Sequence, residues 1–145
     1  MTLLLARWLV TIFAVISLVH VYWALGGTWA AVAVVPQVPQ EGSAALRPAF
    51  KPQGWITLVV AAALLLIAVL VCLRVGWWLP QVHHWSLQWL ISAIALLLFA
   101  RAIGDSELVG FFKEVKGSEF ARLDTWVYSP LCVVLGAGLL AVAWA

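Results

Sequence analysis

The chain consists of long apolar stretches separated by two polar connectors and one short turn. A helix needs ~20 apolar residues to cross a hydrocarbon core of ~30 Å, and each apolar stretch is about that long. Gly26-Gly27 and Pro80, which are typical of helix ends, close the first two stretches. The pattern therefore predicts four membrane spans, at about residues 3–25, 54–79, 85–103 and 125–145.

The lengths of the connections predict how these spans are threaded. Residues Gln81 to His84 form a tight turn, which places the third span antiparallel beside the second. Residues 26–53 and 104–124 are long connectors, and up-and-down threading places both on one membrane face. The first connector contains prolines that deny a continuous helix, namely Pro36, Pro39, Pro48 and Pro52. We predict an all-α membrane protein with one transmembrane domain over residues 1–145, built as a four-span antiparallel transmembrane helix bundle.

An amphipathic segment precedes the last span. Ser118 can accept a backbone N–H as an N-cap, and the segment then places three apolar residues on one helix face, Phe120, Leu123 and Val127. Its charged residues suit the membrane interface. We predict an interfacial amphipathic helix that bends near Pro130 into the last span. Two glycines there permit close packing against a neighbouring helix, Gly136 and Gly138.

Composition supports the membrane assignment. Of the 145 residues, 66 % are hydrophobic and 10 % charged, compared with about 25 % charged in soluble domains. The net charge of +2, with mixed signs, argues against nucleic acid and leaves the lipid bilayer as the expected environment. Several tryptophans lie near the ends of the apolar stretches, as indole prefers the headgroup boundary: Trp29, Trp55, Trp77, Trp78, Trp85 and Trp144. The first stretch is expected to be a retained span rather than a signal peptide, because Val21-Tyr22-Trp23 is bulky where a cleavage site needs small residues.

Polar chemistry collects at the connector face. Residues 101–130 hold four of the eight Lys and Arg residues and five of the six acids. At the rise of an α-helix, His20 lies ~26 Å along the first span and Arg101 ~24 Å along the third, so both reach similar depths. Asp105 follows Arg101 by one turn, close enough to pair with it. Asp124 descends toward the same region from the other chain direction.

These residues form a candidate site for a lipophilic ligand or substrate. His20 is the candidate proton-transfer group, Asp124 its acidic partner, and Arg101 with Asp105 the electrostatic frame. An apolar ligand would pack on four aromatic residues, Trp23, Phe111, Phe112 and Tyr128. Each residue also has a purely structural explanation, since an arginine can snorkel to the headgroups and an aspartate can cap a helix.

Other functions remain open, as does the question of enzymatic activity. One is a non-catalytic membrane subunit or assembly factor, whose charged connector docks a membrane-protein partner. Another is a small transporter that works as an oligomer, with the Arg101–Asp105 pair as its gate.

Several kinds of site are excluded or disfavoured. Cys72 and Cys132 are expected about half a bilayer apart, well beyond the Cα separation of ~7 Å that a disulfide tolerates. His20 lies opposite the turn that carries His83 and His84, so one haem iron cannot be held axially. Adjacent histidines on a turn are more often solvated than metal-bound, and no zinc, phosphate-loop or nucleophile-elbow pattern occurs. We predict no metal and no cofactor.

The distribution of positive charge predicts the orientation. The connector face carries six Lys and Arg residues, Arg47, Lys51, Arg101, Lys113, Lys116 and Arg122. The face of the termini carries two, Arg7 and Arg74. The positive-inside rule then places the connectors in the cytoplasm and the termini outside.

Four motifs together point to a family. They are His20-Val-Tyr-Trp-Ala-Leu-Gly-Gly27, Arg101-Ala-Ile-Gly-Asp105, Val109-Gly-Phe-Phe112 and Phe120-Ala-Arg-Leu-Asp-Thr-Trp-Val-Tyr-Ser-Pro-Leu-Cys132. In this order, over nearly the full length, the chain resembles the small bacterial membrane proteins grouped as domain of unknown function 3995. The resemblance implies a four-span protein of the bacterial plasma (inner) membrane and implies no activity. The motifs coincide with the connector face identified from spacing.

Overall fold

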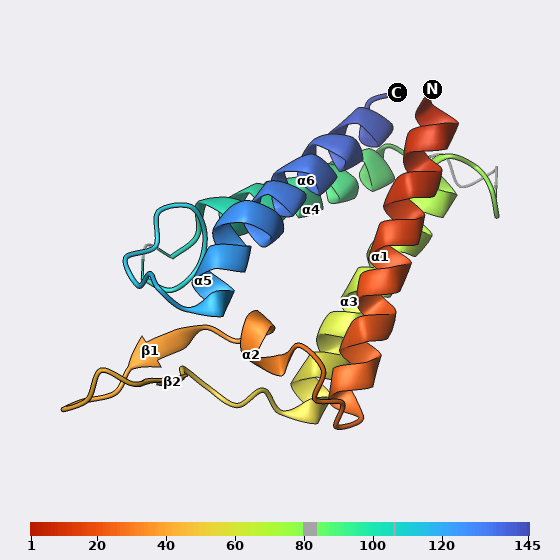
Figure 1. The fold of residues 1–145 in the computed structure, drawn as a ribbon. Coiled ribbons are helices and arrows are strands. Elements are labelled where there is room, and N and C mark those ends of the chain that lie inside the picture. Colours follow the sequence, from red (N-terminus) through yellow and green to blue (C-terminus); the bar gives the residue numbers. More distant parts are fainter. Residues whose placement is uncertain (80–83, 106) are drawn as a thin grey trace.

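The structure is a computed structural model that describes residues 1–79, 84–105 and 107–145, and it is mostly helical (Figure 1). The described residues include four helices long and apolar enough to cross a membrane, which confirms this part of the predicted fold. They are α1 (Thr2–Ala24), α3 (Gly54–Arg74), α4 (Trp85–Ile103) and the helix Glu119–Ala143, which comprises α5 (Glu119–Leu123), η1 (Asp124–Tyr128) and α6 (Ser129–Ala143). Of the predicted turn from Gln81 to His84, residues 81–83 lie outside the described residues.

The long helices pack as two pairs, α1 with α3 and α4 with α6 (Figure 1). One buried apolar cluster joins the pairs, and it uses the N-terminal halves of α1 and α4 and the C-terminal halves of α3 and α6. Phe13, Val71, Ile91 and Leu139 are at its centre and almost fully buried. The core therefore lies toward the termini, which are at the same end in Figure 1. Toward the connectors the two pairs diverge in that view.

Large apolar side chains also cover the outside of the helices. Exposed examples occur on each long helix, such as Leu18, Leu66, Leu97 and Val134. A soluble monomer rarely exposes apolar patches of more than a few hundred Å². These surfaces suit contact with lipid, as the composition predicted.

Two of the helices end in the same glycine motif. After α1, Gly26 has φ +94° and donates its N–H to Trp23 O, while Gly27 donates to Tyr22 O. After α3, Gly76 and the residue that follows it repeat this pattern. Because these bonds satisfy the last free carbonyls, they stop the helix. The second helix consequently ends at Arg74, rather than continuing to Leu79 as the apolar pattern predicted.

The first connector contains a β-hairpin, so the expectation of an all-α chain is incomplete. Short helix α2 (Ala31–Val34) leads into β1 (Gln37–Pro39), which pairs antiparallel with β2 (Leu46–Pro48). The prolines that deny a helix here also favour extended backbone, and the strands are only three residues long. The sequence shows no period-two pattern strong enough to predict such short strands.

The fourth helix passes through one widened turn before Pro130. Ser118 caps it as predicted, accepting the N–H of Ala121 at 2.9 Å. At η1 the N–H of Ser129 donates to Asp124 O, five residues back, which defines a π-type turn. Pro130 follows at the beginning of α6, where it cannot donate a backbone N–H of its own. Where the sequence predicted a bend near Pro130, the structure has this wide turn, which begins at Asp124.

Glycines let α6 approach its neighbours closely. A Cβ atom added at Gly136 would lie 3.0 Å from Phe99 Cε1 and 3.1 Å from Ala95 O, both on α4. One added at Gly138 would lie 2.9 Å from Leu9 Cδ2 on α1. Both glycines are buried, in agreement with the close packing that the sequence predicted.

Replacing Gly136 with leucine should destabilise the α4–α6 pair. The larger side chain would press on the Ala95 carbonyl, which is backbone and moves little, so we expect a loss of about 1–3 kcal/mol or more in unfolding free energy. Titration with SDS from mixed micelles measures this loss. Ala137→Leu is the matched control, because Ala137 is exposed on the same helix. Equal losses for both variants would contradict the packing described here.

Candidate functional site

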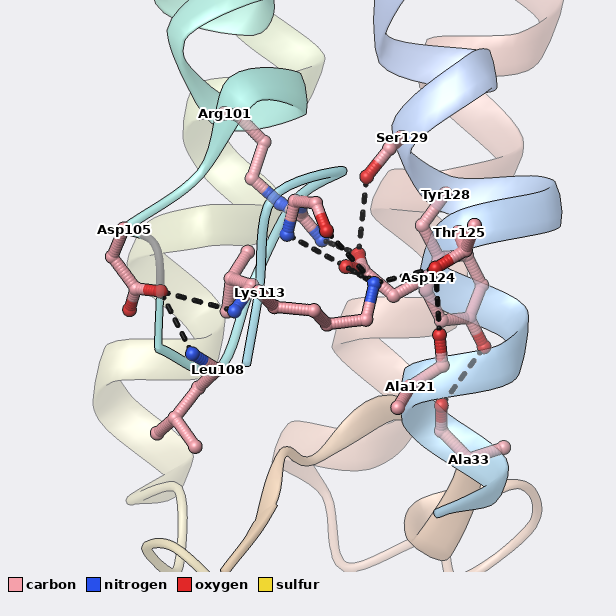
Figure 2. Close-up of polar contacts among 12 residues, drawn as sticks. Ala33, Arg101, Asp105, Leu108, Lys113, Ala121, Asp124, Thr125, Tyr128 and Ser129 are labelled. Atoms are coloured by element: carbon pink, nitrogen blue, oxygen red, sulfur yellow. Dashed lines mark hydrogen bonds and ion pairs between the residues drawn. The ribbon is translucent and has the colours of Figure 1, made fainter. Parts of the chain in front are cut away.

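A fully buried carboxylate, Asp124, is the centre of the polar site at the connector end (Figure 2). Its Oδ1 atom lies 2.6 Å from Arg101 Nη2, and its Oδ2 atom lies 3.0 Å from Lys113 Nζ. The backbone N–H of Gly110 also donates to Oδ2, at 2.7 Å. Charge-assisted bonds of this kind are about twice as strong as neutral ones. One side chain therefore holds together the end of α4, the second connector and η1.

The second connector folds back sharply so that Gly110 reaches Asp124. Gly104 and Gly110 both have positive φ, +88° and +93°. They also lie against each other's backbone, because a Cβ added at either would collide with main-chain atoms beside the other. The N–H of Phe111 donates to Ala102 O, which ties the loop to the last turn of α4. Only glycine tolerates both the conformation and the close approach.

Asp105 stabilises this loop from within. Its Oδ1 atom accepts three backbone N–H groups, from Glu107 at 3.0 Å, Leu108 at 2.9 Å and Val109 at 3.0 Å. These bonds, with that of Leu108 first, lower the pKa of Asp105 below its usual value. Figure 2 shows Asp105 apart from Asp124, on the outer side of the loop. The predicted Arg101–Asp105 pair is therefore wrong, because each residue has a different partner.

Lys113 is buried and belongs to the network of polar bonds around Asp124. All three of its N–H bonds have acceptors there. Its ammonium group lies 2.8 Å from Gly110 O, 3.0 Å from Asp124 Oδ2 and 2.7 Å from Thr125 Oγ1. An ammonium has three N–H bonds, so none is left over. Thr125 in turn donates to Ala121 O at 3.1 Å. Lys113 therefore fixes the second connector to the fourth helix.

Arg101 differs from Lys113 because one of its hydrogen-bond donors has no acceptor among the described residues. Its side chain is 33 % exposed, yet its Nη1 atom is buried and has no hydrogen-bond partner among the described residues. The network contains two cations, Arg101 and Lys113, and one anion, Asp124. Its formal charge is thus +1, with an unused donor on the partly exposed member. A buried donor without a partner costs about 1–3 kcal/mol.

His20 makes its polar contact elsewhere. Its Nδ1 atom lies 2.8 Å from the Ile16 carbonyl of the same helix, and its ring meets Trp23 edge-on at a centroid distance of 5.2 Å. Trp23 donates its indole N–H to Trp29 O at 2.8 Å. Arg101 and Asp124 thus lie together, whereas His20 has its polar contact within α1 and not with Asp124, its predicted partner. Trp23 bonds to the first connector. A proton-transfer role for His20 stays a prediction.

The other predicted aromatic residues fall into two groups. Tyr128 donates its hydroxyl to Ala33 O at 3.0 Å and thereby links η1 to α2 (Figure 2). Phe111 and Phe112 are 42 % and 71 % exposed on the second connector. They follow Gly110 directly, so the loop that completes the Asp124 network also presents two apolar rings outward.

Sequence reasoning missed two members of the network, Lys113 and the N–H of Gly110. In the sequence, Lys113 is one of six positive charges on the connector face, and nothing local distinguishes it from the others. The sequence does carry a usable signal in Gly104 and Gly110, at the two ends of residues 105–109, because such a pair is typical of a loop closing on itself. The partner of Lys113 could not be read from spacing, since it depends on how that loop closes.

Removing the charge of Asp124 should strongly destabilise the protein. Asp124→Asn leaves the buried Lys113 and the partly exposed Arg101 without their counter-ion, and breaking a buried pair in this way costs about 3–5 kcal/mol. SDS titration of the unfolding free energy measures the loss. Glu41→Gln removes one carboxylate from the exposed hairpin and serves as the control. A loss under about 1 kcal/mol, typical of an exposed pair, would contradict the network.

The loop should loosen in acid, and Asp105 should be the cause. Because folding lowers the pKa of Asp105, its contribution is complete above the ordinary value of about 3.9. The contribution is lost as the pH falls through the lowered pKa. Hydrogen-exchange protection factors of the Leu108 and Val109 amides should follow this transition. In Asp105→Asn, which keeps an acceptor oxygen without the charge, the transition should disappear. Identical pH profiles for both proteins would refute the assignment.

Comparison with known proteins gives a family but no activity. No curated protein and no solved structure matches the chain. Residues 13–139 match the family described as "Protein of unknown function (DUF3995)". This match covers most of the chain, including α4, the second connector and the Asp124 network. The chain belongs to the DUF3995 family, as its four motifs predicted.

Proposed function

We propose that the protein is a small integral membrane protein that holds a lipophilic molecule with an acceptor group, such as a carboxylate or phosphate, at the connector face. Its four long helices cross the bilayer in antiparallel order, with α5 at the interface. The connectors face the cytoplasm and the termini the outside, in a bacterial plasma membrane. The ligand's polar group binds Arg101, and Asp124 with Lys113 holds that side chain in place.

The unused donor of Arg101 carries this proposal. Nη1 is buried without a partner among the described residues, although the same guanidinium pairs with Asp124 through Nη2. A buried polar group without a partner calls for an explanation, and a missing ligand, ion or water is a common one. The network's charge of +1 favours an anionic group over a neutral one.

The surroundings favour a lipophilic molecule. Arg101 lies at the end of apolar helix α4, and Phe111 and Phe112 are exposed on the adjoining loop. Ionisable groups within membrane spans usually face protein or water and often mark functional sites. A molecule with an apolar body and one acceptor group can contact the exposed phenylalanine rings and also accept a hydrogen bond from Arg101.

The lipids that co-purify with the protein test the proposal. Arg101→Lys keeps the charge that pairs with Asp124 but removes the second guanidinium nitrogen. Mass spectrometry of protein extracted in a mild detergent should find a specific lipophilic species on the wild type. In Arg101→Lys this species should fall roughly tenfold or more, because a bond to a charged group contributes about 1.5–3 kcal/mol.

The control is Arg47→Lys, at an exposed arginine of the hairpin on the same face. It should carry the same species as the wild type. If wild type and Arg101→Lys carry identical lipids in equal amounts, the proposal fails and the network is only a structural link. A partner-docking subunit or assembly factor would then be the better hypothesis.

A further inference from the structure

A second polar feature lies outside the Asp124 network, at the beginning of the fourth helix. It is a surface recess of about 420 Å³, and we call it the α5 recess. Its walls include Lys116, Arg122 and Trp126, together with Ser118 and Thr125. The network touches the recess through Thr125, whose hydroxyl contacts Lys113.

The recess carries a net positive charge, because two cations and one acid line it. Lys116 and Arg122 line it and are exposed, and Glu119 is the one acid in its lining. Neither cation has an ion pair or side-chain hydrogen bond among the residues that the structure describes. Arg122 and Glu119 are three residues apart on one helix, yet they do not pair. Both cations are thus available to an external anion.

The recess also has an apolar wall. Trp126 is 78 % exposed and lines the recess together with the two cations. An exposed indole next to basic side chains, at the end of an apolar helix, is typical of the headgroup level of a bilayer. Lys and Arg side chains at this level are attracted to anionic lipid.

We infer that the α5 recess binds the phosphate headgroup of an anionic phospholipid from the surrounding bilayer. Lys116 and Arg122 contact the phosphate, and Trp126 packs against the glycerol and the upper acyl chain. The inference rests on the membrane placement proposed above, but not on a ligand at Arg101. The lipid bound here holds α5 and the second connector against the membrane surface.

Fluorescence quenching by brominated lipids tests the site directly. The protein is reconstituted in equal mixtures of phosphatidylglycerol and phosphatidylcholine, with bromine on one lipid at a time. The difference between wild type and Trp126→Phe isolates the signal of Trp126. Brominated phosphatidylglycerol should quench this signal several-fold more than brominated phosphatidylcholine. The preference should shrink as salt is added, because the cations are exposed.

Two double variants decide the outcome. Lys116→Gln with Arg122→Gln should bring the quenching ratio close to one. Lys51→Gln with Arg47→Gln removes the same charge from the first connector and should leave the ratio unchanged. The inference is overturned if the wild-type ratio is already near one, or if both double variants lower it equally. Neither result bears on Arg101, so the two proposals can fail separately.

Discussion

A single buried charge decides how the connector end of this protein is built. Asp124 has no exposed surface and accepts bonds from Arg101, Lys113 and Gly110. An ion in an apolar interior costs several kcal/mol unless partners replace its water. The chain supplies these partners from α4 and the second connector, and each must stay in place for the others to be stable. The fold-back of the second connector meets part of this requirement, because it brings Gly110 and Lys113 to Asp124.

The two ends of the molecule are held by different forces. Toward the termini, apolar side chains of all four long helices form one cluster, and two glycines let α6 pack closely. In lipid the hydrophobic effect does not drive helices together, so such close packing has to supply the association. Toward the connectors the helix pairs diverge (Figure 1). Ion pairs join α4 and the second connector to the fourth helix there, and the hydrogen bond from Tyr128 to Ala33 joins the fourth helix to α2.

Apolar length and composition were enough to predict four long helices, because each stretch reports a local property of the chain. The cap at Ser118 and the packing glycines of α6 were predictable for the same reason. Pairing was harder. Helical spacing favoured Asp105 as the partner of Arg101, but the chain leaves the helix at Gly104 and Asp105 bonds to its own loop. Lys113 reaches Asp124 only because that loop folds back, which no periodicity encodes. The hairpin was missed because three-residue strands leave too short a pattern.

The charge state of Asp124 tests the account most directly. Infrared difference spectra between the wild type and Asp124→Asn, recorded in lipid at neutral pH, isolate the signal of this one side chain. The ion network predicts that the substitution removes a carboxylate band, because Arg101 and Lys113 stabilise the ionised form. Loss of a protonated-carboxyl band instead would mean that Asp124 is neutral, and the proposed organisation of the connector end would be wrong.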